Sequence, residues 1–260
     1  MAQAFDFDTH EQQRVDWYNA TEGFHLGYNC PKCKNRGNFA LRNALGFLAF
    51  RSCDCMEVRK SVDKMEQSGL ARTVREKSFQ KYRAEEMWQQ VLKKGAMAYA
   101  AKPQGWFLMC GQPGSGKTHL CTAVCRELLL RGEAVQYMSW RDAMAELKGA
   151  MAEGDRRNAL MDQWKQARFL YIDDLFKVGK DPEGRSEPTR ADRDLTFELV
   201  NYRYTNSLPT LFSTERSPDA LLQIDEATGS RIIELAGVHL YSIDPDPKKN
   251  YRLRRPGGVQ

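Results

Sequence analysis

The chain has 260 residues, of which 42% are hydrophobic and 28% charged, with a formal net charge of +5, so it is long enough to bury the core of one large domain, or of a medium domain with a small appendage. Its longest apolar runs fall far short of the roughly 18 residues that a membrane span needs, and its N-terminus lacks the charged-then-apolar pattern of a signal peptide. We therefore expect a cytoplasmic protein with no membrane partner.

Four of the seven cysteines form two close pairs in the first quarter of the chain, "CPKC" and "CDC". The segment between the pairs predicts two short strands around a turn at residues 43–46, which would bring four thiolates together as a tetrahedral zinc site. The second pair has one intervening residue where the common zinc ribbon has two, so unligated thiols are the alternative, and His25 is a substitute ligand to consider. The expected zinc ligands are Cys30, Cys33, Cys53 and Cys55.

Basic residues gather in two segments of the chain. Residues 30–60 carry seven basic and two acidic residues, and residues 245–260 carry five and one. Such clusters suit an acidic partner, either nucleic acid or a protein surface, and surface charge that only keeps the protein soluble is an equally good explanation.

Two helical patterns follow the cysteines and precede the first strand of the larger domain. They cover residues 56–69 and 84–101, the first ending at a glycine. We place the domain boundary between residues 68 and 80. This gives an N-terminal domain over residues 1–74 and a second domain over residues 75–260 that ends in the basic tail.

The stretch "GQPGSGKTHL" fits the phosphate-binding loop pattern G-x-x-x-x-G-K-[ST], behind a predicted strand and ahead of a predicted helix. Its glycines let backbone N–H groups approach a phosphate, Lys117 would reach the β- and γ-phosphates, and Thr118 would ligate Mg²⁺. A chance glycine turn is the alternative, but the strand and helix around it favour ATP binding. The expected nucleotide-binding residues are Gly111, Gln112, Pro113, Gly114, Ser115, Gly116, Lys117, Thr118 and His119.

Downstream of this loop the chain alternates between strands and helices, as a parallel α/β sheet requires. Nucleotide is expected at the carboxyl ends of the strands. The remaining cysteines lie in apolar context and are expected to be small buried hydrophobic residues: Cys110, Cys121 and Cys125. The predicted strands are 105–110, 134–140, 167–174, 209–215 and 238–244, and the predicted helices are 117–132, 141–154, 190–206, 217–225 and 229–237.

Two aspartates end the strand "FLYIDD". Asp173 would hold Mg²⁺ through water, and Asp174 would orient or deprotonate the attacking water. Aspartate is shorter than the glutamate that many ATPases use in the second role, so we expect slow hydrolysis. The alternative is a pair of acids that merely solvates the end of a strand.

The segments "GQPGSGKTHL", "LYIDDLF", "FELVNYRYTNSLPTLFSTE" and "IDEATGSRI" follow one another in this order. Over about residues 75–244 the chain resembles the AAA+ ATPases of the bacterial and phage replicative-helicase loader family, the DnaC and DnaI group of the IstB-like ATP-binding proteins. The cysteine pairs resemble the zinc-binding, helicase-interacting N-terminal domain of the DnaI branch. The resemblance implies an α/β fold, with an AAA+ P-loop NTPase core, a parallel sheet and no C-terminal lid, plus a small N-terminal zinc-binding domain.

The resemblance also assigns further residues to the ATPase site. Glu215 ends a strand where the family has its first sensor, usually an asparagine, and this departure puts phosphate sensing there in doubt. Arg231 matches the arginine finger that reaches the ATP of a neighbouring subunit, and a surface arginine capping local carbonyls is the alternative. Arg203 would face a subunit interface or a DNA path, or would simply be an exposed helix arginine.

The function that the resemblance implies is ATP-dependent loading of the replicative DNA helicase onto single-stranded DNA during replication initiation or primosome assembly. The expected activity is a slow, assembly-dependent ATPase with ATP, Mg²⁺ and Zn²⁺ as cofactors. The expected partners are the replicative helicase, single-stranded DNA and further copies of the chain, with ATP sites at the subunit interfaces. The alternatives are an IstB-type transposition helper that works on duplex DNA, and a zinc-containing ATP-binding adaptor with little hydrolysis.

Overall fold

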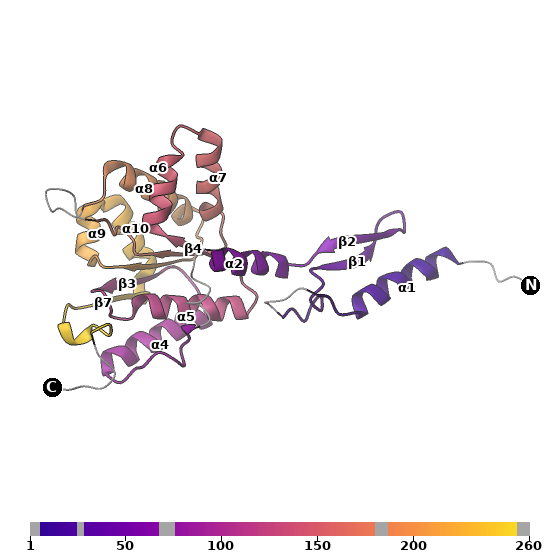
Figure 1. The fold of residues 1–260 in the computed structure, drawn as a ribbon, viewed down its shortest axis with the longest axis horizontal. Coiled ribbons are helices and arrows are strands. Elements are labelled where there is room, and N and C mark those ends of the chain that lie inside the picture. Colours follow the sequence, from indigo (N-terminus) through magenta and orange to yellow (C-terminus); the bar gives the residue numbers. More distant parts are fainter. Residues whose placement is uncertain (1–5, 25–28, 68–75, 180–186, 254–260) are drawn as a thin grey trace, which may run out of the picture. The chain divides into compact units, whose positions relative to one another are not determined.

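The structure, a computed structural model, describes residues 6–24, 29–67, 76–179 and 187–253 (Figure 1). The chain divides into two compact units, residues 1–63 and residues 64–260. Within the described ranges, none of the helices has the length and apolar character that crossing a bilayer requires.

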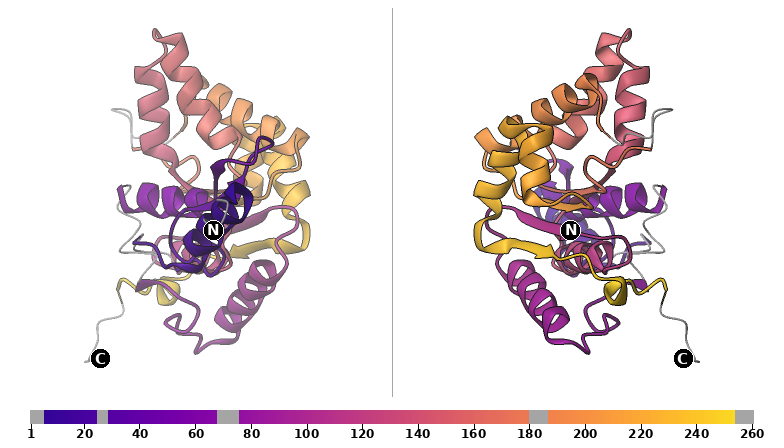
Figure 2. Two further views of the ribbon diagram at one scale, coloured as in Figure 1. Left: turned by 90° about the vertical axis from the view of Figure 1, so that its right-hand side faces the viewer. Right: turned by 90° about the vertical axis from the view of Figure 1, so that its left-hand side faces the viewer.

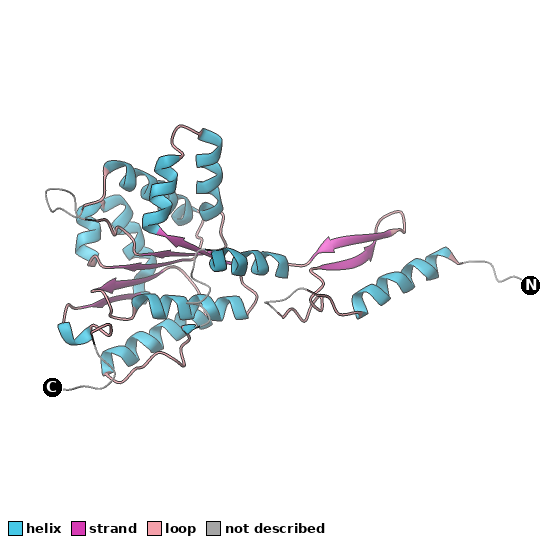
Figure 3. Cartoon of the chain, viewed as in Figure 1, coloured by secondary structure: helices cyan, strands magenta, loops and turns pink. Residues whose placement is uncertain are grey.

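The N-terminal unit is built around a two-stranded hairpin, coloured as strands in Figure 3. β1 and β2 pair antiparallel, with Ala40 opposite Phe50, and the Asn43 N–H donates to the Phe47 carbonyl across the turn at 2.9 Å. The hairpin predicted between the cysteine pairs is therefore confirmed. The elements of this region are α1 (Phe7–Ala20), β1 (Asn38–Arg42), β2 (Leu48–Ser52) and α2 (Cys55–Gln67).

Helix α1 was not predicted from the sequence. Asp6 caps its start by accepting hydrogen bonds from the backbone N–H groups of Asp8 and Thr9, and its Tyr18 hydroxyl donates to Asn38 of β1 at 2.6 Å. Only Glu11 and Val15 are buried in this helix, so its sequence lacks the apolar stripe by which amphipathic helices are recognised. The predicted end of α2 at residue 69 lies outside the described residues.

The larger unit contains a five-stranded parallel sheet in the order β4-β5-β6-β3-β7. All five strands predicted from the sequence are present, and β6 separates β3 from β5. Because the strands are parallel, the ends of β3, β5 and β6 meet at one edge of the sheet. The strands are β3 (Phe107–Gly111), β4 (Val135–Ser139), β5 (Phe169–Asp173), β6 (Thr210–Thr214) and β7 (Leu240–Ile243).

Helices cover both faces of this sheet, with α4 and α5 on one face and α6, α8 and α10 on the other (Figures 1 and 2). The predicted α/β class is confirmed. The elements are α4 (Met87–Ala101), α5 (Lys117–Leu130), α6 (Trp140–Gly149), α7 (Gly154–Lys165), α8 (Arg190–Thr205), α9 (Pro218–Ile224), α10 (Glu226–Ala236) and the 3₁₀ turns η1 (Gly237–His239) and η2 (Pro247–Lys249).

The single helix predicted over residues 141–154 is shorter in the structure, and α7 follows it. Helix α6 ends at Gly149, and α7, which the sequence did not predict, buries only Met161 and Trp164. Two buried positions spaced three apart give too weak a periodic signal to identify a helix from sequence alone.

The core of the larger unit follows the alternation of strand residues. In β3, Leu108 and Cys110 belong to the hydrophobic cluster under α6, α8 and α10, whereas Phe107 faces Tyr99 of α4, with ring centroids 5.1 Å apart. The prediction that three cysteines are small buried hydrophobic residues is confirmed, and burial raises the pKa of Cys110 to about 12. These fully buried cysteines are Cys110, Cys121 and Cys125.

Arg203 of α8 is a buried structural residue, so its expected place at a subunit interface, a DNA path or an exposed helix face was wrong. Its side chain is 0% exposed, and burial lowers its pKa to about 9. The guanidinium bridges the end of α7 to the starts of β5 and β6. It donates to the carbonyls of Trp164 (2.9 Å), Lys165 (3.1 Å), Ala167 (2.7 Å) and Pro209 (2.7 Å) and to the Thr210 hydroxyl (2.8 Å).

Candidate nucleotide-binding site and cysteine cluster

The loop between β3 and α5 has the backbone shape of a phosphate-binding loop. Gly116, which caps the start of α5, has a φ of +94°, a conformation that glycine adopts readily. A Cβ there would also lie 3.0 Å from the ring of Tyr82. Within the loop, the Ser115 hydroxyl donates to the Gln112 carbonyl at 2.8 Å. Both the backbone conformation at this position and the neighbouring Tyr82 ring therefore favour glycine.

Lys117, the first residue of α5, is 5% exposed and extends back along the loop. Its Nζ donates to the carbonyls of Gly111 at 2.6 Å and Gln112 at 2.9 Å. Burial lowers the pKa of Lys117, although the charges of Glu215 and Asp174 favour its protonated form. The ammonium is therefore held where it can contact phosphate oxygens that lie in the loop.

Thr118 and Asp173 meet across the sheet edge, as the sequence predicted for a magnesium site. The Thr118 hydroxyl donates to Asp173 Oδ1 at 3.3 Å, and Asp173 is 7% exposed. A hydroxyl beside a carboxylate is an oxygen donor set that suits Mg²⁺, so the residues present fit this ion. The same carboxylate accepts hydrogen bonds from the hydroxyls of Tyr137 (3.3 Å), Tyr171 (2.7 Å) and Ser213 and from the N–H of Asp174 (3.1 Å).

The other two acids at this edge share a lysine that the sequence reasoning missed. Lys177 Nζ lies 3.0 Å from Asp174 Oδ2 and 2.8 Å from Glu215 Oε1. Burial alone would lower the pKa of Lys177, but its hydrogen bonds to Glu215 and Asp174 outweigh burial and raise it. Asp174 itself has a φ of +55°. No motif marks Lys177, whose only signal is that it lies three residues after Asp174.

A cavity of about 310 Å³ lies between the phosphate-binding loop and the ion pairs of Lys177. It is lined by the loop residues Pro113 to His119 except Ser115, by Asp174, Lys177 and Glu215, and by two segments that the sequence did not assign to the site, residues 77–83 and 251–252. His119 Nε2 lies 3.0 Å from the Ser78 carbonyl, and its ring packs edge-on against Tyr82. Burial lowers the pKa of His119, which favours the neutral imidazole.

Arg231 lies on α10, outside the residues that line this cavity. Its Nη1 donates to the Ala227 carbonyl at 2.6 Å, and its Cζ is 5.2 Å and 5.4 Å from the ring centroids of Phe197 and Tyr204. The contact with a local carbonyl fits the alternative interpretation, and its role across a subunit interface stays a prediction.

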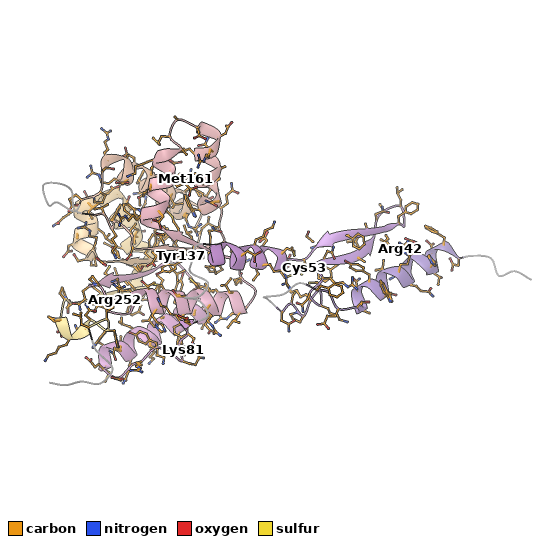
Figure 4. The ribbon with its side chains drawn as sticks, viewed as in Figure 1. Arg42, Cys53, Lys81, Tyr137, Met161 and Arg252 are labelled. Atoms are coloured by element: carbon orange, nitrogen blue, oxygen red, sulfur yellow. The ribbon has the colours of Figure 1, made fainter. Side chains whose placement is uncertain are left out.

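The four N-terminal cysteines form one compact cluster, near the Cys53 label in Figure 4. All four are buried, and their Sγ atoms lie within 4.8 Å of one another. Burial alone would raise the pKa of Cys33, but the Gly37 N–H and the neighbouring thiols bring it to about 7. Four buried sulfurs that converge on one point fit a structural Zn²⁺. The alternative ligand His25 lies outside the described residues.

Comparison with known proteins identifies relatives of this chain. Residues 39–217 match the family of IstB-like ATP binding proteins. The chain is 32% identical over 228 residues to the phage-like element PBSX protein XkdC of Bacillus subtilis, covering 83% of this chain and 82% of XkdC. It is 26% identical over 161 residues to the replicative helicase loader DnaC of Escherichia coli, covering 60% of this chain and 61% of DnaC.

Solved structures share the fold. A crystal structure of the DnaC helicase loader has a TM-score of 0.57 at 21% identity, covering 66% of this chain and 99% of the other. A crystal structure of DnaI has a TM-score of 0.53 at 19% identity, covering 70% and 93%. These likenesses confirm the predicted fold of the α/β core. Since the family match spans more than half of the sequence and includes the phosphate-binding loop, the chain belongs to the IstB-like ATP-binding protein family.

Proposed function

We propose that this chain is an ATP-dependent loader of the replicative DNA helicase onto single-stranded DNA, acting in replication initiation or primosome assembly. The observation that carries the proposal is one cavity lined by Lys117, Thr118 and Asp174, with Asp173 hydrogen-bonded to the Thr118 hydroxyl, in a chain related in sequence to a replicative helicase loader. A site of this composition can switch a protein between nucleotide states.

In this proposal the residues of the cavity divide the work of ATP hydrolysis. Residues 111–119 and the Lys117 ammonium bind the phosphates, and Thr118 and Asp173 hold Mg²⁺. Asp174 orients the attacking water, which requires that it leave its ion pair with Lys177. Glu215 occupies the sensor position, and Arg231 stabilises the developing phosphate charge in a neighbouring copy of the chain.

The N-terminal region, residues 1–74, carries the helicase contact in this proposal. Zn²⁺ bound by the four-cysteine cluster would stabilise a hairpin whose two strands are too short to fold by themselves. Residues 75–260 form the ATPase domain with its basic tail, and single-stranded DNA lies along basic and helical elements of the ATPase core. Hydrolysis of ATP then releases the helicase on DNA.

A transposition helper of the IstB type is the second candidate. The family match over residues 39–217 supports it, because a shared ATPase core serves either function. Such a protein works with a transposase on duplex DNA, so the two candidates differ in partner and in the form of DNA rather than in the ATP site.

The test is capture of purified partners by the immobilised full-length chain, with ATP, with ADP and without nucleotide. We expect the replicative helicase of the same host to be retained with ATP and released with ADP, and single-stranded DNA to stimulate hydrolysis. Lys117→Ala should abolish both effects. Retention of the transposase with stimulation by duplex DNA would favour the second candidate, and retention of neither protein would contradict both.

A further inference from the structure

The chain segment after β7 docks directly on the phosphate-binding loop. We call residues 246–252 the C-terminal strap, which is yellow in Figure 1. The side-chain amide of Gln112 donates to the Asp246 carbonyl at 2.7 Å and accepts from the Asp246 N–H at 2.6 Å. The Tyr251 N–H donates to the Gly114 carbonyl at 2.9 Å. These three hydrogen bonds tie the strap to two residues of the loop.

Gly114 shows how closely the strap and the loop approach each other. A Cβ at this position would lie 1.9 Å from Asn250 Oδ1, and its φ of +75° is one that side chains rarely adopt. Glycine at this position therefore leaves room for the strap as well as for an approaching phosphate. Any movement of the loop is expected to reach the strap through this contact.

A second segment, residues 77–83 ahead of α4, meets the strap over the same loop. The Tyr251 hydroxyl donates to the Arg83 carbonyl at 3.1 Å and contacts the Gln89 side chain. Tyr82 of this segment is 5% exposed and lies against Gly116. Two segments from opposite ends of the ATPase unit thus form one wall of the cavity. Figure 4 labels Lys81 in the first and Arg252 in the second.

This wall brings two cations to the cavity, Lys77 and Arg252. Within the described part of the chain, neither side chain has a carboxylate at ion-pair distance, unlike Lys177, which contacts two. Burial lowers the pKa of Lys77; the charge of Asp173 raises it, and the charge of Arg252 lowers it. Two neighbouring cations repel each other, and an anion bound by both removes that cost.

We propose that Lys77 and Arg252 form a second phosphate-binding pair, which grips the polyphosphate chain of the nucleotide from within the same subunit and adds to the contact made by Lys117. The proposal rests on the ATP site proposed above. Bound polyphosphate would contact both the strap and residues 77–83, so the occupied site holds together two segments that lie far apart in the sequence.

The experiment is titration of the full-length chain with a fluorescent ATP analogue, using Arg252→Gln, Lys77→Gln and Lys117→Ala. One charge-assisted hydrogen bond is worth about 1.5–3 kcal/mol, so each glutamine variant should bind about tenfold or more weakly. Arg252→Lys should retain most of the affinity. The matched control is Lys249→Gln, which removes the same charge from the strap at a side chain directed to the Asp244 carbonyl and the Trp88 ring, and it should bind within about twofold of the wild type.

Competition with inorganic tripolyphosphate separates phosphate contact from general damage to the strap. We expect tripolyphosphate to displace the analogue from the wild type at a lower concentration than from Arg252→Gln, which keeps Lys117. The affinity of Arg252→Gln for tripolyphosphate should be at least about tenfold lower than that of the wild type. Unchanged tripolyphosphate affinity in Arg252→Gln and Lys77→Gln would overturn the proposal if Lys117→Ala loses binding. Full binding by Lys117→Ala would instead overturn the ATP site itself.

Discussion

Replacing Arg203 by methionine tests the interpretation of this residue as a structural link. Met has no donors, so the change removes five hydrogen bonds from a fully buried side chain. Two of the acceptors keep another partner: the Pro209 carbonyl accepts from Leu170 at 3.3 Å, and the Thr210 hydroxyl donates to Leu208 at 3.0 Å. The loss therefore falls on three carbonyls. They belong to Trp164, Lys165 and Ala167.

Each buried acceptor left without a partner costs about 1–3 kcal/mol, so we expect Arg203→Met to lower the free energy of unfolding by about 4 kcal/mol or more. This is a large part of the roughly 5–15 kcal/mol by which domains are stable. For a unit of this size it corresponds to a fall in Tm of roughly 8–16 °C. Arg203→Lys keeps the charge and up to three donors, so its free energy of unfolding should lie between those of the wild type and Arg203→Met.

Differential scanning calorimetry of the full-length chain, followed on the transition of the larger unit, measures this loss. The matched control is Arg190→Met on the same helix. The Arg190 side chain is 88% exposed, and its Nε lies 3.6 Å from Asp194 Oδ2, so this variant should change the free energy of unfolding by less than about 0.5 kcal/mol. If Arg203→Met melts within 2 °C or so of the control, the five hydrogen bonds do not stabilise the unit as argued.

Three further predictions concern the acids of the ATP site, the cysteines and pH. Lys177→Met frees Asp174 from a partly exposed ion pair worth about 0.5 kcal/mol, so basal phosphate release should rise about twofold, and a slower rate would contradict this. Cys33→Ser should lower zinc from about one per chain to well below that in metal analysis, and full zinc content would argue against the cluster. Burial alone would raise the pKa of Glu198, but its contacts with Arg157 and Lys165 outweigh burial and lower it. The stability that Glu198 contributes is therefore complete above its ordinary pKa of 4.5 and is lost as the pH falls below that value. Glu198→Gln should melt lower than the wild type at neutral pH but not in acid, and an equal difference in Tm at both pH values would refute the linkage.

The sequence by itself determined the parts of the site that are local in the chain. The phosphate-binding loop is a strand, a turn and a helix start within residues 105–120, and its backbone shape follows from where its glycines lie. The cysteine pairs are likewise joined by a short hairpin with a turn at Asn43. Such features are set by interactions between residues close in sequence, which spacing and residue type encode directly.

Only the tertiary structure decided which distant residues complete the site. The Gln112–Asp246 pair joins residues 134 positions apart, and Glu215 meets Lys177 only because β5 and β6 pair in parallel with Tyr171 opposite Leu211. The same holds for Arg203, whose helical position allowed an exposed face but whose guanidinium lies among the carbonyls of α7, β5 and β6. Periodicity shows that a helix or strand has a buried face, whereas the partners on that face depend on strand order, register and helix packing, and these are fixed only when the whole core assembles.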